Sequence, residues 1–171
     1  MPEDILDRHS RKGLLIDANL LVLLIIGALD RNQISTNNRT REYCPEDYDL
    51  LCAFLKLSNG PILTTPNILT ETSNIVFASL NEPLRNRAML SIRELASMQL
   101  KEEPVLSVHA VQEPIFTRLG LTDSGIAYLR RLKCVFLTVD SDLYVHLSRI
   151  GANVINFNHH RSHLSNSFKA T

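Results

Sequence analysis

The chain has 171 residues, 44% of them hydrophobic and 21% charged, which fits one globular domain with a hydrophobic core and excludes a wholly disordered or fibrous protein. The 18 basic and 18 acidic residues cancel, so the chain lacks the positive field of proteins that coat duplex nucleic acid, and any nucleic-acid contact has to be local. Three cysteines without C-x-x-C spacing argue against a disulfide framework or a thiolate zinc site and favour a reducing, cytoplasmic compartment.

The chain begins with a polar leader, residues 1–12, before its first apolar run. Residues 14–16 predict a buried strand, and an apolar helix is expected from about Leu20. Asp17 and Asn19 interrupt this apolar stretch, and the remaining ten residues are too short to span a bilayer, so we expect no membrane partner. Residues 31–46 are polar and predict a long functional loop without an apolar anchor.

Two helices and a second strand are expected next. Pro45, followed by two acidic residues, opens a helix that ends near Gly60, and residues 62–63 form a short strand. Thr65 then caps a helix that carries Glu71.

The central part of the chain predicts more helix than strand. A helix is expected over residues 83–100, and residues 105–108 are a short strand candidate. Gly120 ends a helical pattern, and residues 122–132 form the helix after it.

The clearest strand signal lies near the end of the chain. Residues 135–139 are rich in β-branched and aromatic side chains; a helix over 141–150 and a strand over 154–157 follow. From residue 158 the composition is polar and rich in histidine, which predicts a flexible tail outside any site. Strands that alternate with helices predict an α/β domain with a mostly parallel sheet.

Aspartates stand at the ends of two predicted strands. Asp17 follows a buried apolar strand, where an unpaired carboxylate is costly, and Asn19 offers either a helix cap or a further ligand. Asp140 repeats the arrangement, with Asp142 two residues on and Thr138 on the same strand face. Because ligands bind beyond the carboxyl ends of parallel strands, both aspartates are expected at one site.

Two further carboxylates are candidates for the same site. Glu71 lies at the border of the apolar stripe of its helix, and Asp123 lies in the first turn of another helix, where the helix dipole favours an aspartate in any protein. Neither position is distinctive alone.

In combination, these segments resemble the successive acidic motifs of the PIN-domain family. The matching motifs are L-L-I-D-A-N-L-L, P-N-I-L-T-E, L-T-D-S-G-I and F-L-T-V-D-S-D-L-Y, in the family's order and with its rough spacing. The resemblance covers residues 13–157, which would be the nuclease domain between the leader and the tail. A long polar segment at 31–46 and an added helix near 85–100 depart from the smallest toxin-type members.

The resemblance implies a three-layer α/β/α fold and an endoribonuclease active site. It implies four catalytic, metal-binding carboxylates, Asp17, Glu71, Asp123 and Asp140, supported by Asn19, Thr138 and Asp142. Such hard oxygen ligands suit Mg²⁺ or Mn²⁺ better than zinc, and a divalent cation would relieve the repulsion between the four charges.

Basic side chains would contact the phosphates of a single-stranded or structured RNA. The candidates are Arg39, Arg41, Arg85, Arg130 and Arg131. Few aromatic residues are present (6%), so an extended base-stacking platform is not expected.

Other interpretations remain open at this stage. Each aspartate separately could be a simple helix cap. The domain could also be a non-catalytic PIN-like scaffold or RNA-binding module in an RNA-processing or antitoxin-bound assembly. Relatives of this type are commonly toxins held by an antitoxin protein, and commonly homodimers, so the resemblance implies both partners.

Overall fold

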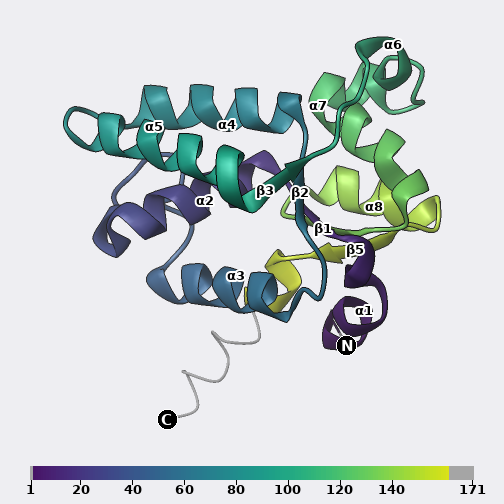
Figure 1. Cartoon of the computed structure of the whole chain (residues 1–171), viewed down its shortest axis with the longest axis horizontal. Coiled ribbons are helices and arrows are strands. Elements are labelled where there is room, and N and C mark those ends of the chain that lie inside the picture. The colour runs from purple at the N-terminus through teal and green to yellow at the C-terminus, as the bar shows by residue number, and fades with distance from the viewer. Residues whose placement is uncertain (1, 162–171) are drawn as a thin grey trace.

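The computed structural model describes residues 2–161 as an α/β domain with helices on both faces of a five-stranded, all-parallel sheet (Figure 1). The strands, in spatial order, are β3 (Leu100–Glu102), β2 (Ile62–Thr64), β1 (Leu14–Ile16), β4 (Val135–Thr138) and β5 (Asn153–Asn156). The α-helices are α1 (Pro2–His9), α2 (Ala18–Leu29), α3 (Pro45–Leu57), α4 (Pro66–Ser79), α5 (Leu84–Glu94), α6 (Ser107–Ala110), α7 (Phe116–Tyr128) and α8 (Ser141–Arg149). The predicted three-layer fold class is confirmed, and the sheet is parallel throughout.

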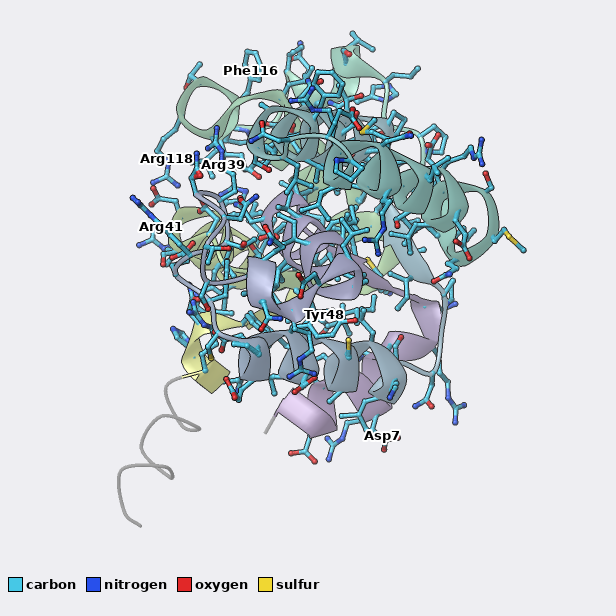
Figure 2. The ribbon with its side chains drawn as sticks, turned by 90° about the vertical axis from the view of Figure 1, so that its left-hand side faces the viewer. Asp7, Arg39, Arg41, Tyr48, Phe116 and Arg118 are labelled. Atoms are coloured by element: carbon cyan, nitrogen blue, oxygen red, sulfur yellow. The ribbon has the colours of Figure 1, made fainter. Side chains whose placement is uncertain are left out.

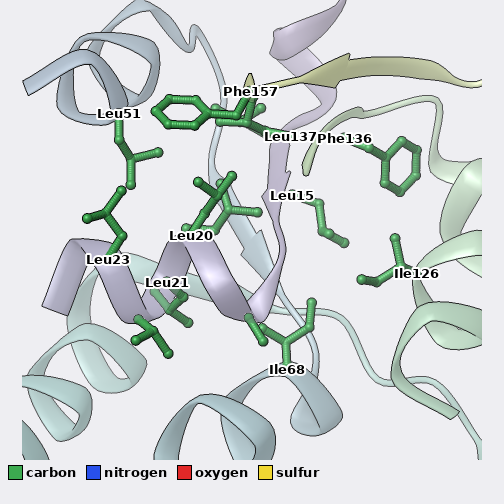
Figure 3. Packing of buried hydrophobic residues seen from close by; sticks show 14 of the residues in the cluster. Leu15, Leu20, Leu21, Leu23, Leu51, Ile68, Ile126, Phe136, Leu137 and Phe157 are labelled. Carbon is green, nitrogen blue, oxygen red and sulfur yellow. The ribbon is translucent and has the colours of Figure 1, made fainter. Parts of the chain in front are cut away.

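Side chains alternate between the two faces of the central strands, and both faces are covered. Leu15 and Phe136 point toward Ile126 of α7, whereas Leu137 lies with Leu20 of α2 on the other side (Figure 3). Burial on both faces explains why these strands are continuous apolar runs without a polar–apolar alternation.

The apolar run over residues 14–29 is divided between β1 and α2. Helix α2 packs against α3, α4 and α5, and eight of its 12 residues are buried, which accounts for its apolar character on all sides. The helix begins at Ala18, two residues earlier than predicted, because Asp17 and not Asn19 is its cap. Among the described residues, no helix is both long and apolar enough to cross a membrane.

Three helices begin at the carboxyl edge of the sheet, each with a side-chain cap. Asp17 caps α2, Thr65 caps α4 and Asp140 caps α8. In each case a side-chain oxygen accepts a hydrogen bond from the amide three residues on, at 2.8, 3.1 and 2.7 Å respectively. Strands β1, β2 and β4 therefore each lead directly into a helix whose first turn lies at the carboxyl edge of the sheet.

The prediction of a strand at residues 105–108 is wrong. The edge strand is β3, five residues earlier, and residues 107–110 form the short helix α6. Strand β3 pairs with β2 only, and its Lys101 and Glu102 are exposed, so it has no apolar run to reveal it in the sequence.

The polar segment over residues 31–46 is packed against the domain, contrary to the expectation that it lacks an apolar anchor. Ile34 is fully buried and Tyr43 is 3% exposed, both within the core cluster. The Asn37 amide also donates to the carbonyl of Ser79 at 3.0 Å. Two well-spaced apolar residues are thus enough to hold the segment in place.

Both ends of the described chain belong to the fold. The expected leader contains helix α1, whose Leu6 is buried in the core. The predicted tail begins with a helical turn over residues 158–161, and the His160 ring lies 5.5 Å from the ring of Phe54. The rest of the predicted flexible tail, residues 162–171, lies outside the described residues.

Candidate active site

The carboxyl ends of β1 and β4 are neighbours in the sheet. Ile16 pairs with Leu137, and the amide of Asp17 donates to the Leu137 carbonyl at 3.2 Å. This register places Asp17 beside Thr138 and brings Asp140 close to both. The two aspartates predicted at strand ends therefore meet at one edge.

Asp17 is almost entirely enclosed by protein donors. Its side chain is 5% exposed; Oδ1 accepts from the Leu20 amide at 2.8 Å, and Oδ2 accepts from the Thr138 hydroxyl at 2.6 Å and the Val139 amide at 2.9 Å. Burial raises the pKa of Asp17, and these three hydrogen bonds oppose that rise. The negative charge of Asp140 raises it further.

Thr138 connects the two aspartates. Its hydroxyl donates to Asp17 Oδ2 and accepts from the Asp140 amide at 3.0 Å, which uses both functions of one hydroxyl group. Asp140 in turn caps α8 through Oδ1. Thr138, which was predicted to support the site, therefore fixes the relative placement of both aspartates.

Asp123 and Glu71 come from helices α7 and α4, which pack against each other. The pKa of Asp123 is raised from 3.8 to about 7, mainly by burial and in addition by the charges of Asp140, Asp17 and Glu71. The other three predicted carboxylates therefore all lie within electrostatic range of Asp123.

The carboxylates are near each other without forming a ready-made metal site. Within residues 2–161, no three histidine, cysteine, aspartate or glutamate side chains converge closely enough to ligate one ion. Asp17 is turned toward protein donors, which helps to explain this. The donor set still suits a hard divalent cation, because Glu71, Asp123 and Asp140 Oδ2 accept no hydrogen bond from the described residues and the acidic neighbours of Asp123 raise its pKa.

A groove of about 570 Å³ lies beside the acidic residues. Glu71 lines it from α4, Thr122 lines it next to Asp123, and Arg39 lines it from the polar segment. Arg39 and Arg41 are both exposed and, within residues 2–161, their guanidinium groups make no hydrogen bond or ion pair. Figure 2 shows them near one edge of the molecule.

Two predicted supporting residues, Asn19 and Asp142, are exposed. Asn19 lies in the first turn of α2. Asp142 Oδ1 pairs with Arg118 of α7 at 3.3 Å. This surface pair links the starts of α7 and α8.

Three of the five predicted RNA-contacting arginines lie elsewhere or are engaged by the protein. Arg130 and Arg131 precede β4, at the sheet edge opposite the carboxylates. Arg130 Nη1 donates to both carboxylate oxygens of Glu113, at 2.7 and 2.8 Å. Arg131 stacks on Tyr128, and Arg85 donates to the Leu80 carbonyl at 2.9 Å. Of the five, Arg39 alone lines the groove.

Tyr43 is a neighbour of the site that the sequence did not indicate. Its hydroxyl is buried without a hydrogen-bond partner in the described part of the chain, and the charge of Asp17 is among the causes that raise its pKa, after burial. Arg161 stacks on its ring, 4.4 Å from the centroid. A single aromatic residue in a polar run gave no pattern from which this position could be found.

No protein-family model, curated protein or solved structure matches the chain significantly.

Proposed function

We propose that this chain is a divalent-metal-dependent endoribonuclease of the PIN type. The observation that carries the proposal is the meeting of four carboxylates from four separate segments at the carboxyl edge of the sheet, beside a groove lined by an unpaired arginine. A helix-cap role explains one oxygen of Asp17 and one of Asp140. It does not explain why Glu71 lies close enough to Asp123 for its charge to raise the pKa of that residue. The resemblance of the four motifs to PIN domains supports the same conclusion.

The four carboxylates are the residues that would hold Mg²⁺ or Mn²⁺. Asp140 has a free oxygen and would be a central ligand with Asp17, which keeps one lone pair of Oδ1 that no protein donor uses; Glu71 and Asp123 would be outer ligands or position water. When bound, such an ion lowers the pKa of a water molecule and stabilises negative charge on phosphate oxygens during an in-line displacement.

The contribution of the other residues is to hold the carboxylates in position. The hydrogen bonds of Thr138 and of the Val139 amide favour the charged form of Asp17 and fix its orientation. Because Thr138 also accepts from the Asp140 amide, a shift of one aspartate is transmitted to the other. Such hydrogen bonds hold catalytic side chains in the geometry that the reaction needs.

The substrate class follows from charge and from the groove. Arg39 supplies positive charge to the groove that Glu71 also lines, on a chain whose net charge is zero. Such local charge suits phosphates of a short stretch of RNA, single-stranded or in an open part of a structured molecule, better than a long duplex.

The test is cleavage of a panel of single-stranded and structured RNAs in Mg²⁺ or Mn²⁺ and in chelator. The wild type is compared with Asp140→Asn and with a matched control, Asp49→Asn, an exposed aspartate of α3 that pairs with Arg31. We expect cleavage that needs the metal, is lost in Asp140→Asn and is retained in the control. Metal-independent cleavage, or equal cleavage by both variants, contradicts the proposal.

The second candidate is a non-catalytic PIN-like scaffold or RNA-binding module. The observation that favours it is the lack of three converging metal ligands within the described residues. A titration with Mn²⁺ separates the two candidates. Binding that Asp140→Asn abolishes favours the nuclease, whereas a folded wild type that binds neither Mn²⁺ nor Mg²⁺ favours the scaffold.

A role as the toxin of a toxin–antitoxin pair, a homodimeric state and a cytoplasmic location are part of the proposal and rest on the sequence. If the chain is such a toxin, its expression arrests growth and Asp140→Asn does not. Light scattering of the purified protein gives the oligomeric state.

A further inference from the structure

The groove beside the acidic residues is lined by polar and apolar side chains that catalysis does not require. Besides Arg39 and Glu71, its lining consists of one face of α4 and two residues of α7: Asn67, Thr70, Asn74, Ile75, Leu121 and Thr122. The spacing of 67, 70 and 74 puts the three polar side chains in a row along the helix.

These three polar side chains are free to bind something else. Within residues 2–161, no hydrogen bond involves the carboxamides of Asn67 and Asn74 or the hydroxyl of Thr70, whereas Asn37 and Asn158 of the same structure donate to backbone carbonyls. A carboxamide offers a donor and an acceptor side by side. A row of such groups beside an arginine matches a ligand that has both a hydrogen-bonding edge and a negative charge.

We propose that this groove binds one unpaired nucleotide of the RNA next to the bond that is cut, with Asn67 and Asn74 selecting the base and Arg39 holding its phosphate. The inference rests on the proposed nuclease function. It adds to that function the source of sequence preference, which a chain with 6% aromatic residues does not obtain from an extended stacking platform.

The dimensions and the continuity of the groove support this ligand. A volume of about 570 Å³ falls within the roughly 300–1,000 Å³ of sites that hold small organic ligands, a range that includes a nucleotide. Glu71 belongs both to the groove and to the acidic group, so a nucleotide in the groove lies directly beside the reacting phosphate.

The chemistry of the groove favours one base over the others. Adenine presents an acceptor next to its amino group on two edges, N1 with N6 and N7 with N6, so two carboxamides can each form a two-bond contact with it, whereas an unpaired cytosine presents such an edge only once. The exposed Leu121 side chain offers an apolar surface for the face of the base. We therefore expect faster cleavage beside an unpaired adenine.

The experiment measures kcat/KM for short single-stranded RNAs that differ only in the base beside the cleavage site. Asn67→Ala and Asn74→Ala are compared with the wild type and with Asn86→Ala, an exposed asparagine of α5 outside the groove. We expect each groove variant to reduce the preference for adenine about tenfold, with the rates on the other bases nearly unchanged. The control should keep the wild-type preference.

Arg39→Gln tests the phosphate contact, with Arg149→Gln at the far end of α8 as its control. We expect Arg39→Gln to weaken RNA binding equally for all bases and to lower its salt dependence, because a phosphate contact carries no base information. Unchanged affinity and salt dependence would remove Arg39 from the proposal.

The outcomes for the groove and for the nuclease are separable. If the wild type cuts RNA and both groove variants keep the full base preference, the groove proposal is overturned and the nuclease stands. If the folded wild type cuts nothing, the nuclease proposal fails and RNA binding, followed by fluorescence anisotropy, decides the groove. Base-dependent affinity that is lost in Asn67→Ala and Asn74→Ala supports it, and affinity that does not change overturns it.

Discussion

Replacing Asp123 by asparagine should stabilise the metal-free protein at neutral and higher pH. The pKa of Asp123 is raised from 3.8 to about 7, first by burial and then by its three acidic neighbours, so the folded state binds this proton more tightly than the unfolded state. The stability contributed by the bound proton is therefore greatest at low pH and is lost as the pH rises from about 4 to about 7. Asparagine keeps the shape and removes the charge.

The size of the effect follows from the pKa shift. At roughly 1.4 kcal/mol per pKa unit, the full shift corresponds to about 4 kcal/mol. Asp123 is partly exposed, and screening by solvent reduces this, so we expect a gain of about 1–2 kcal/mol at pH 8.

The assay is urea denaturation of both proteins between pH 5 and pH 8 in chelator, repeated with Mg²⁺. In chelator, the asparagine variant should gain stability relative to the wild type as the pH rises. In Mg²⁺ the wild type should recover stability by ligand binding and the variant should recover less. A constant difference across this pH range, or a variant that is less stable at pH 8, would refute the argument that burial and the acidic neighbours raise the pKa of Asp123.

Three further predictions test the placement of other residues. Thr138→Val, which is nearly isosteric, removes a hydrogen bond from the buried Asp17 and should lower the free energy of unfolding by about 1–3 kcal/mol, measured by urea denaturation; an unchanged value would mean that the bond is not formed. Gly27→Ala places a Cβ against the ring of Tyr48 and should lower the free energy of unfolding by about 1–3 kcal/mol. Gly125→Ala, whose Cβ meets no atom closer than 3.8 Å, should be tolerated, and equal melting temperatures of the two variants would contradict this packing. Arg131→Gln, on the edge opposite the carboxylates, should leave RNA affinity unchanged, and a clear loss in a binding titration would place RNA on that edge as well.

The parts of the fold with a strong local signal could be predicted from the sequence. The buried strands β1 and β4, the helix starts at Pro45 and Pro66 and the break at Gly120, where φ is +80°, follow from apolar runs and from residues with restricted or unusual backbone freedom. The strand ends also placed Asp17 and Asp140 at one edge, because parallel neighbours end together.

What could not be predicted depends on contacts between distant segments. β3 is defined by its pairing with β2 and not by its own composition, and the polar segment over 31–46 is held by isolated residues such as Ile34 and Tyr43. The arginines show the same limit: Arg39 and Arg130 look alike in sequence, yet only the fold shows that one lines the groove and the other is paired with Glu113 on the opposite side.

The helical turn at residues 158–161 contacts the polar segment that carries Arg39. Arg161 pairs with Asp47 at 3.1 Å, donates to the carbonyl of Glu42 and stacks on Tyr43. These contacts fasten the polar segment just beyond Arg39. A protein cut after Phe157 would keep all five strands and all four carboxylates but would lose these contacts of Arg161. The position of Arg39, and with it the affinity for RNA, therefore depends on a residue that belongs to neither the sheet nor the acidic group.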